Sequence, residues 1–305
     1  MSRRILLSFL CSSFLAFGPF ATAQDDPLTV QDQSASAQQC RFVSISVNNN
    51  EAEPMAINDA GTIAGNYFPQ GLSVGFVLQN GKIKTVSFPG ALFTLIFGIN
   101  DAGVVVGDYG FFDTAPPHGF VYSKGHFVPI DVPGAMQTDA RAVNRYGQIV
   151  GDFSGNAVNS QHGFLLSGGK FHRIDFPGKV NTFLTGINDS GMITGEFQQD
   201  RNCTSACALD SFELLNGHFT IIGLPHSRET NALGINDFKT KVGDVRLSNN
   251  VIEGFVLKKG QFRTFGRPNF RSTFFNGINS SGVIVGTAFP VHNGSGGFAA
   301  FGCTK

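Results

Sequence analysis

The chain has 305 residues, a formal net charge of zero and only 14% charged residues. It lacks a run of basic side chains, which argues against binding to nucleic-acid phosphates or to an anionic membrane surface. Phenylalanine (32) and glycine (38) are abundant, whereas tryptophan is absent. Glycine at this density without a Gly-X-Y period indicates many tight turns.

Residues 1–23 are typical of a secretory signal peptide, with two arginines near the start, an apolar run over 5–20 and the small residues Ala-Thr-Ala at 21–23. The apolar run is too short for a stable membrane span. Residues 24–39 are polar and predict a flexible leader. We therefore expect a secreted protein, extracellular or periplasmic, without membrane insertion, whose folded domain covers residues 40–305.

An internal repeat organises that domain. An aliphatic residue followed by asparagine recurs six times, at spacings of 42, 44, 44, 48 and 43 residues between the asparagines. A glycine follows each aliphatic residue after eight positions, and a Gly-Phe or Ser-Phe pair comes later. The asparagines are Asn58, Asn100, Asn144, Asn188, Asn236 and Asn279.

Each copy divides into four short runs of β-branched and aromatic residues, separated by Asp-x-Gly or x-Gly turns that are hairpin signals. Four strands in about 44 residues is typical of a propeller blade. The sequence therefore predicts an all-β, six-bladed β-propeller with four antiparallel strands per blade. Radial closure would also remove exposed sheet edges.

The two ends of the domain complete each other in this alignment. The last copy stops after its third strand, and the missing fourth strand precedes the first copy at residues 41–46. Cys40 and Cys303 then occupy the position of the turn between third and fourth strands. We predict a Cys40–Cys303 disulfide that closes the ring, and a Cys203–Cys207 disulfide within the long loop of the fourth copy.

These repeats resemble those of the bacterial extracellular HAF-type repeat proteins, in which Gly-Ile-Asn-x-x-Gly-x-Val-Val-Gly precedes His-Ala-Phe. The matches include Gly98-Ile99-Asn100 with Gly107, and His118-Gly119-Phe120. Other copies carry Val, Asp, Glu or Gly in place of the histidine. The resemblance spans residues 40–305 and implies export and a propeller fold, without an established catalytic activity.

Three recurrent polar positions are candidates for chemistry. Carboxylates after the second-strand glycine could bind a cation, but we favour structural hydrogen bonds because equivalent residues of different blades are spread around the ring. His118 and His162 could pair with Asp108 and Asp152, again as structural contacts. A threonine five residues before each later aliphatic-Asn pair is interpreted as a cap of its own loop. The carboxylates are Asp108, Asp152, Glu196 and Asp244; the threonines are Thr94, Thr138, Thr182, Thr230 and Thr273.

Residues that break the repeat are more informative, because the fold alone does not require them. They lie in the loops leading into the innermost strands, which share one face of a propeller with the loop of the fourth copy. Loops on a rigid scaffold are the usual binding surface. The candidate ligand-binding residues are Glu53, Asp139, Arg141, His226, Arg228 and Glu229.

The leading hypothesis is a secreted, non-catalytic, monomeric binding or scaffold module that recognises a glycan, peptide or protein on this face. The alternative is a propeller hydrolase or lyase with a divalent cation at the channel mouth. The leading hypothesis needs no cofactor, whereas the alternative would make calcium the candidate metal. No catalytic residue is assigned, because no nucleophile, zinc or phosphate-loop motif occurs.

Overall fold

The computed structural model describes residues 40–111, 116–155, 161–198, 209–290 and 295–304. The expected signal peptide and leader, and the expected Cys203–Cys207 disulfide, lie outside these ranges. The regular secondary structure of the described residues is almost entirely β-strand, which confirms the all-β prediction. A single 3-10 turn, η1 (Pro69–Gly71), is the only helix among them. No helix in these ranges is long and apolar enough to cross a membrane.

Within each repeat, consecutive strands are antiparallel neighbours. The innermost members of this succession are β2 (Asn50–Ile57), β6 (Phe93–Ile99), β10 (Gln137–Val143), β14 (Val180–Ile187), β18 (Glu229–Ile235) and β22 (Phe270–Ile278). Beside them lie β3 (Ile63–Tyr67), β7 (Val105–Gly110), β11 (Ile149–Ser154), β15 (Ile193–Gln198), β19 (Lys241–Arg246) and β23 (Ile284–Pro290). Third come β4 (Val74–Gln79), β8 (His118–Ser123), β12 (Gln161–Ser167), β16 (Leu209–Leu215), β20 (Ile252–Lys258) and β24 (Gly296–Phe301). Outermost are β5 (Lys82–Val86), β9 (His126–Ile130), β13 (Lys170–Ile174), β17 (His218–Ile222), β21 (Gln261–Phe265) and β1 (Arg41–Val47).

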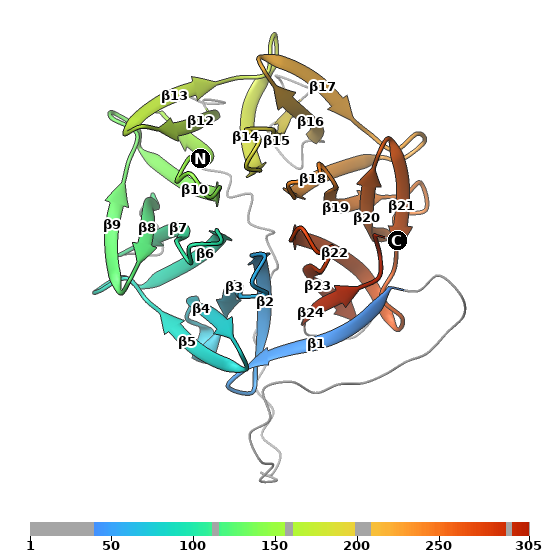
Figure 1. Cartoon of the computed structure of the whole chain (residues 1–305), viewed down its shortest axis with the longest axis horizontal. Coiled ribbons are helices and arrows are strands. Elements are labelled where there is room, and N and C mark those ends of the chain that lie inside the picture. Colours follow the sequence, from blue (N-terminus) through green and yellow to red (C-terminus); the bar gives the residue numbers. More distant parts are fainter. Residues whose placement is uncertain (1–39, 112–115, 156–160, 199–208, 291–294, 305) are drawn as a thin grey trace.

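Hydrogen bonds join these strands into a large mixed sheet of sixteen strands and two separate four-stranded sheets, β6–β9 and β10–β13. The large sheet is continuous because single parallel pairs link β16 to β18 and β20 to β22. β1 also pairs with β2 at two positions. Figure 1 shows the strands arranged radially around a central axis, with the strands that precede the repeated asparagines nearest to it.

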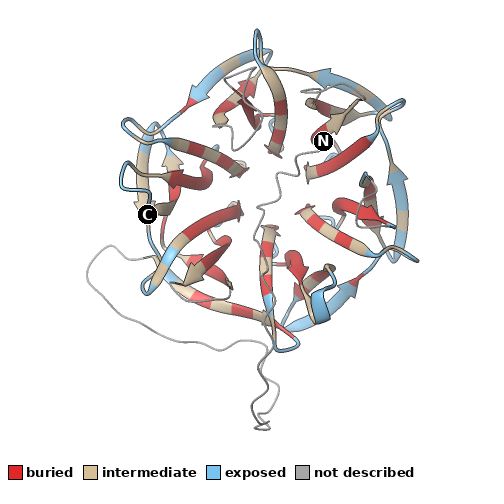
Figure 2. Ribbon diagram, turned by 180° about the vertical axis from the view of Figure 1, so that it is seen from behind, coloured by how far each residue is buried: buried red, intermediate tan, exposed pale blue. Residues whose placement is uncertain are grey.

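Burial is greatest on the second strand from the axis and least on the outermost strand. β15 is buried along its whole length, whereas β9 and β13 have no buried residue. Figure 2 shows the same trend around the ring, with buried residues on the inner strands and exposed ones on the outer strands. A phenylalanine of each third strand is fully buried, and Phe76, Phe120, Phe164, Phe212, Phe255 and Phe298 are these six. The Gly-Phe or Ser-Phe repeat therefore supplies the main core side chain.

The repeated glycine of the second strand has a steric cause. A Cβ built on Gly107 or Gly151 would overlap the carbonyl oxygen of the innermost strand beside it. That strand carries a register shift near the contact, which brings its backbone close. The x-Gly turns between third and fourth strands have positive φ at both residues, as at Lys124 (52°) and Gly125 (89°), which is typical of hairpin turns that match strand twist.

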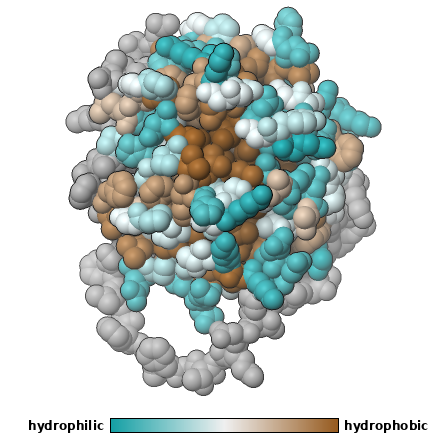
Figure 3. Space-filling view, turned by 60° about the vertical axis from the view of Figure 1, so that its left-hand side comes forward, coloured by the Kyte–Doolittle hydropathy of each residue, from teal (hydrophilic) through white to brown (hydrophobic). Residues whose placement is uncertain are grey.

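The outer surface mixes apolar and hydrophilic side chains. Seen from the side that Figure 1 draws on the left, apolar side chains gather at the centre with hydrophilic ones around them (Figure 3). The most exposed large apolar side chains come from different strands and turns, and include Val128, Tyr146, Ile221 and Phe238.

The two ends of the domain meet as the repeat alignment predicts. β1 lies antiparallel to β24 over five residue pairs, from Arg41–Phe301 to Ile45–Gly297. Cys40 and Cys303 form the predicted disulfide, with a sequence separation of 263 residues. Cys303 is fully buried in an apolar cluster that also contains Phe275 and Phe298.

Removing this disulfide should lower stability strongly, because it closes nearly the whole described chain. Chain-entropy reasoning assigns a loop of this length on the order of 5 kcal/mol, as an upper figure. The Cys40→Ser/Cys303→Ser double variant should therefore unfold at a clearly lower urea concentration than the wild type. The double variant leaves no free thiol at either position. Equal midpoints in urea titrations would contradict an energetic role for the closure.

Candidate functional site

The ends of the innermost strands form a circle around the axis, which we call the asparagine ring. The side-chain amide of Asn58 donates to the carbonyl oxygen of Asn100 at 3.0 Å, and Asn100 donates to Asn144 at 2.9 Å. The same bond continues from Asn144 to Asn188, Asn236 and Asn279, and Asn279 returns to Asn58 at 3.1 Å. Each amide oxygen accepts a backbone N–H four residues further on. The asparagine is therefore more than the turn former that its sequence position indicates.

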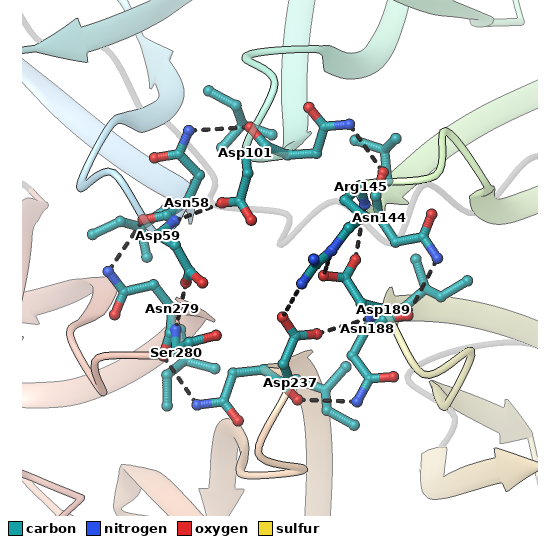
Figure 4. A pocket seen from close by; sticks show the side chains of 18 residues that line it. Asn58, Asp59, Asp101, Asn144, Arg145, Asn188, Asp189, Asp237, Asn279 and Ser280 are labelled. Atoms are coloured by element: carbon teal, nitrogen blue, oxygen red, sulfur yellow. Dashed lines mark hydrogen bonds and ion pairs between the residues drawn. The ribbon is translucent and has the colours of Figure 1, made fainter.

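The residue after each asparagine lines the same end of the axis, around a cavity of about 80 Å³ (Figure 4). We call this set the aspartate mouth: Asp59, Asp101, Arg145, Asp189, Asp237 and Ser280. Its carboxylates accept backbone N–H groups from the preceding repeat, as from Asp59 to Asp101 at 2.8 Å and from Asp189 to Asp237 at 2.8 Å. Arg145 forms ion pairs with Asp189 and Asp237. These contacts make this end a structural closure between repeats.

The other end of the innermost strands carries a second polar group. Asp139 and Asn144 lie five residues apart on and just after β10, which corresponds to about 16 Å along an extended strand. Around Asp139, four adjacent inner-strand pairs contribute charged side chains, of which the carboxyl groups of Asp108, Asp139, Asp152, Glu196 and Asp244 are buried. We call this set the carboxylate belt: Asp108, Asp139, Asp152, Glu196, Glu229 and Asp244, with Arg141 and Arg246.

Arg141 is the central cation of the belt. Its Nε donates to Asp152 Oδ1 at 3.1 Å, and its Nη2 lies 3.7 Å from Asp139 Oδ2. The guanidinium also stacks 4.5 Å from the centre of the Phe97 ring. Burial opposes its charge, but the carboxyl groups of Asp152, Asp139 and Asp108 together raise the pKa of Arg141 above its usual value.

Asp139 and Asp244 are held by neighbouring amides. Gln137 Nε2 donates to Asp139 Oδ2 at 2.5 Å, and Asn231 Nδ2 donates to Asp244 Oδ2 at 3.0 Å. At the edge of the belt, Arg246 Nε donates to Glu229 Oε2 at 3.3 Å.

Burial is the main cause of the raised pKa values in the belt. It raises the pKa of Asp152 to about 7 and that of Asp244 to about 7. It raises the pKa of Glu196 to about 8, with a further contribution from Asp244. The pKa of Asp108 is raised well above its usual value by burial and by Asp139. Near neutral pH these carboxyl groups therefore hold or exchange protons.

Several acceptor oxygens of the belt have no hydrogen-bond partner among the described residues. They are Asp108 Oδ1, Asp152 Oδ2, Glu196 Oε1 and Asn231 Oδ1. Asp108, Asp152 and Glu196 are at most 5% exposed. Buried polar atoms normally have a hydrogen-bond partner, so these acceptor oxygens lack donors that a bound molecule would supply.

The structure joins only some of the predicted site residues. Asp139, Arg141 and Glu229 lie on the strands β10 and β18 rather than in the loops where the sequence placed them, and they belong to the belt. Glu53 lies on β2, where burial and then Glu51 raise its pKa to about 7. Arg228 donates instead to Asn250 on an exposed turn at 2.8 Å. Among the contacts of the described residues, none joins His226 or Arg228 to the belt.

Two sequence interpretations of recurrent residues need correction. His118 and His162 pair with Asp131 and Asp175, not with Asp108 and Asp152. The post-glycine carboxylates do not form the expected bonds to backbone N–H groups but interact electrostatically across repeats, since Asp244 and Asp152 both raise the pKa of Glu196. These residues lie beside the innermost strands, where the ring is narrow. The spacing of the repeats along the sequence could not reveal how these side chains lie relative to one another in space.

The threonine interpretation is confirmed. Thr94, Thr138 and Thr182 each accept the backbone N–H six residues earlier, at 2.9, 3.0 and 2.9 Å. Thr230 and Thr273 do the same at 3.2 and 2.8 Å. These hydroxyls therefore cap the loops that enter the innermost strands.

No protein-family model and no curated protein matches the chain. Solved structures do resemble it. The β-propeller domain of the Trilobed protease from Pyrococcus furiosus is 11% identical, with a TM-score of 0.53 over 86% of this chain and 84% of that one. A gluconolactonase from Xanthomonas campestris is 10% identical, with a TM-score of 0.52 over 93% and 97%. A mutant of the Aleuria aurantia lectin in complex with Fucα1-6GlcNAc is 10% identical, with a TM-score of 0.51 over 82% and 96%. At these identities the likeness shows the fold alone, a β-propeller.

Asn188→Ala should destabilise the protein by about 1–3 kcal/mol, because it leaves the carbonyl of Asn236 and the N–H of Met192 without their buried partners. Urea denaturation would measure the change. Asn249→Ala is the matched control, since its side chain bonds only within an exposed turn and its loss should cost about 0.5 kcal/mol or less. Similar losses for the two variants would contradict a special role for the ring.

Stability should fall as pH rises through the belt's titration range. A carboxyl group whose pKa is higher in the folded than in the unfolded chain binds its proton more tightly when folded, so its contribution is lost as pH rises towards the folded pKa. We expect a lower melting temperature at about pH 8 than at about pH 5, measured by circular dichroism. Glu196→Gln, which is neutral throughout, should show a smaller decrease. A melting temperature that rises over this range would contradict the raised pKa values.

Proposed function

We propose that the protein is a secreted, non-catalytic binding module whose ligand occupies the belt end of the propeller axis. The observation that carries the proposal is the set of buried, unpartnered acceptor oxygens on adjacent inner-strand pairs. A hydroxyl-rich ligand supplies the donors that these oxygens lack. We therefore propose a glycan, in preference to a peptide or protein partner, and a monomeric module.

The proposed architecture has six blades of four strands. Supporting it, antiparallel pairing runs from each innermost strand outwards through three neighbours, as in β2–β3–β4–β5 and β6–β7–β8–β9. The last group, β22, β23 and β24, has β1 as its fourth strand. The links that merge these groups into one sheet are the single parallel pairs and the two-residue pairing of β1 with β2. On the same repeats we propose a relationship to the HAF-type family.

Export is supported by the Cys40–Cys303 disulfide, because disulfides persist mainly in oxidising compartments. The leader sequence that would direct export lies outside the described residues. A secreted location would also place the belt where it meets extracellular or cell-wall glycans.

A hydrolase or lyase is the second candidate, and one observation favours it. Burial, the largest cause in each case, brings the pKa of Asp152 and Asp244 to about 7, the range in which a carboxyl group acts as general acid or base. The described residues contain no group of three or more His, Cys, Asp or Glu side chains placed to hold a metal ion. We therefore propose no calcium site for this candidate.

Binding to a glycan array, followed by titration of the best glycan, tests the proposal. Arg141→Gln and Asn231→Ala alter the belt and should each weaken binding about tenfold or more, since a hydrogen bond to a charged group contributes about 1.5–3 kcal/mol. Tyr146→Ala is the control and should bind like the wild type; its exposed ring lies beside Arg145 of the aspartate mouth. Melting temperatures must accompany the affinities, because Arg141→Gln leaves buried carboxyl groups without their cation.

Two outcomes would contradict the proposal. Equal affinities for wild type and Asn231→Ala would place the site away from the belt. A loss confined to Tyr146→Ala would place it at the aspartate mouth. Turnover of the bound glycan, seen as new reducing ends, would favour the hydrolase or lyase.

A further inference from the structure

The belt carries more negative groups than positive ones. Six carboxyl groups face two guanidinium groups, and Arg246 pairs with Glu229 at the edge, where the side chains are 41% and 21% exposed. Arg141 is thus the one cation among Asp108, Asp139 and Asp152. The other described charge on these strands, Lys241, pairs with Glu213. If every carboxyl group ionised, the belt would hold four uncompensated negative charges.

Buried charges of one sign are costly, because the low local dielectric strengthens their repulsion and removes hydration. Without a ligand, bound protons reduce this charge. The raised pKa values of the belt carboxyl groups mean that they keep protons near neutral pH; these groups are Asp108, Asp152, Glu196 and Asp244. Protons also allow Asp108 and Asp152 to form side-chain hydrogen bonds with Asp139. Glu196 Oε1, by contrast, has no partner among the described residues.

A protonated amine would both neutralise excess negative charge and donate hydrogen bonds to the unpartnered oxygens. It supplies three N–H donors and one positive charge at a single atom. A neutral hydroxyl supplies a donor without the charge, and an anionic group would add to the repulsion. A divalent metal ion would need a cluster of ligands that the described residues do not provide.

Three side chains of the belt region are partly exposed to solvent. Arg141 is 23% exposed and Glu229 is 21% exposed, and Asn231 is also half-buried. They lie on β10 and β18, the innermost strands on either side of β14. A ligand group that contacts Arg141 lies beside Asp152, to which the Nε of Arg141 donates.

From the charge excess and the unpartnered oxygens, we infer that the ligand of the belt is an amino sugar oligosaccharide, whose protonated amines bind the carboxyl groups of Asp108, Asp152 and Glu196. This inference rests on the proposed glycan-binding function and narrows its ligand class. Binding then exchanges belt protons for ligand ammonium groups. The exchanged protons leave to the buffer, so charge balances without a further reactant.

Glucosamine oligosaccharides and their fully N-acetylated counterparts are the matched probes, because they share one backbone and differ in the amine charge. The wild-type protein should bind the glucosamine oligomer at least about tenfold more tightly at pH near 7. Calorimetry in buffers of different ionisation enthalpy should show proton release. The affinity should fall at about pH 5, where the belt carboxyl groups keep their protons.

Glu196→Gln tests the belt without removing its shape. It should reduce the preference for the glucosamine oligomer severalfold, while keeping a wild-type fold by circular dichroism. Asp101→Asn makes the same change of charge at the aspartate mouth and should leave the preference unaltered. If Asp101→Asn abolished the preference and Glu196→Gln did not, the amine would bind at the opposite end and the inference would be wrong.

The remaining outcomes separate the two claims. Equal binding of both oligomers by the wild type would overturn the amino-sugar inference and leave the glycan proposal standing. A preference without proton release would also overturn it, since the unpartnered oxygens would then be satisfied by internal water. Binding to neither oligomer, nor to any glycan on the array, would end both proposals.

Discussion

The circle of asparagine amides around the axis is the contact on which the rest of the molecule depends. Each repeat contributes one donor and one carbonyl acceptor, so every bond joins two repeats and the last bond, from Asn279 to Asn58, joins the ends. A circle of this kind is satisfied only when all its members are present and correctly spaced. It therefore fixes the relative height of the innermost strands, and with it the positions of every residue that those strands carry.

Ring closure is repeated at the periphery by different means. β1 supplies the outermost strand beside β24, and the Cys40–Cys303 disulfide replaces the turn that other repeats have at this point. Hydrogen bonds at the axis and a covalent bond at the rim thus act on the same junction.

The two ends of the axis use charge differently. At the aspartate mouth, carboxylates accept backbone N–H groups and Arg145 bridges two of them, so the charges are largely committed to the fold. In the belt, carboxyl groups are buried, hold raised pKa values and leave oxygens unpartnered. Stability alone would favour apolar side chains at such positions. The belt therefore lowers stability, and the proposed ligand is our explanation for it.

The sequence by itself determined the repeat, the all-β class, the pairing of β1 with β24 and the Cys40–Cys303 bond, because period-two burial, turn glycines and strand order are local or one-dimensional properties. It also identified Asp139, Arg141 and Glu229 as departures from the repeat. Only the tertiary structure decided that Asp108, Asp152, Glu196 and Asp244 join them, and that His226 and Arg228 do not. Distances across neighbouring repeats depend on how narrow the ring is at the axis and on which way each side chain leaves its strand. The asparagine ring escaped sequence analysis for the same reason: its bonds join residues 42 or more positions apart.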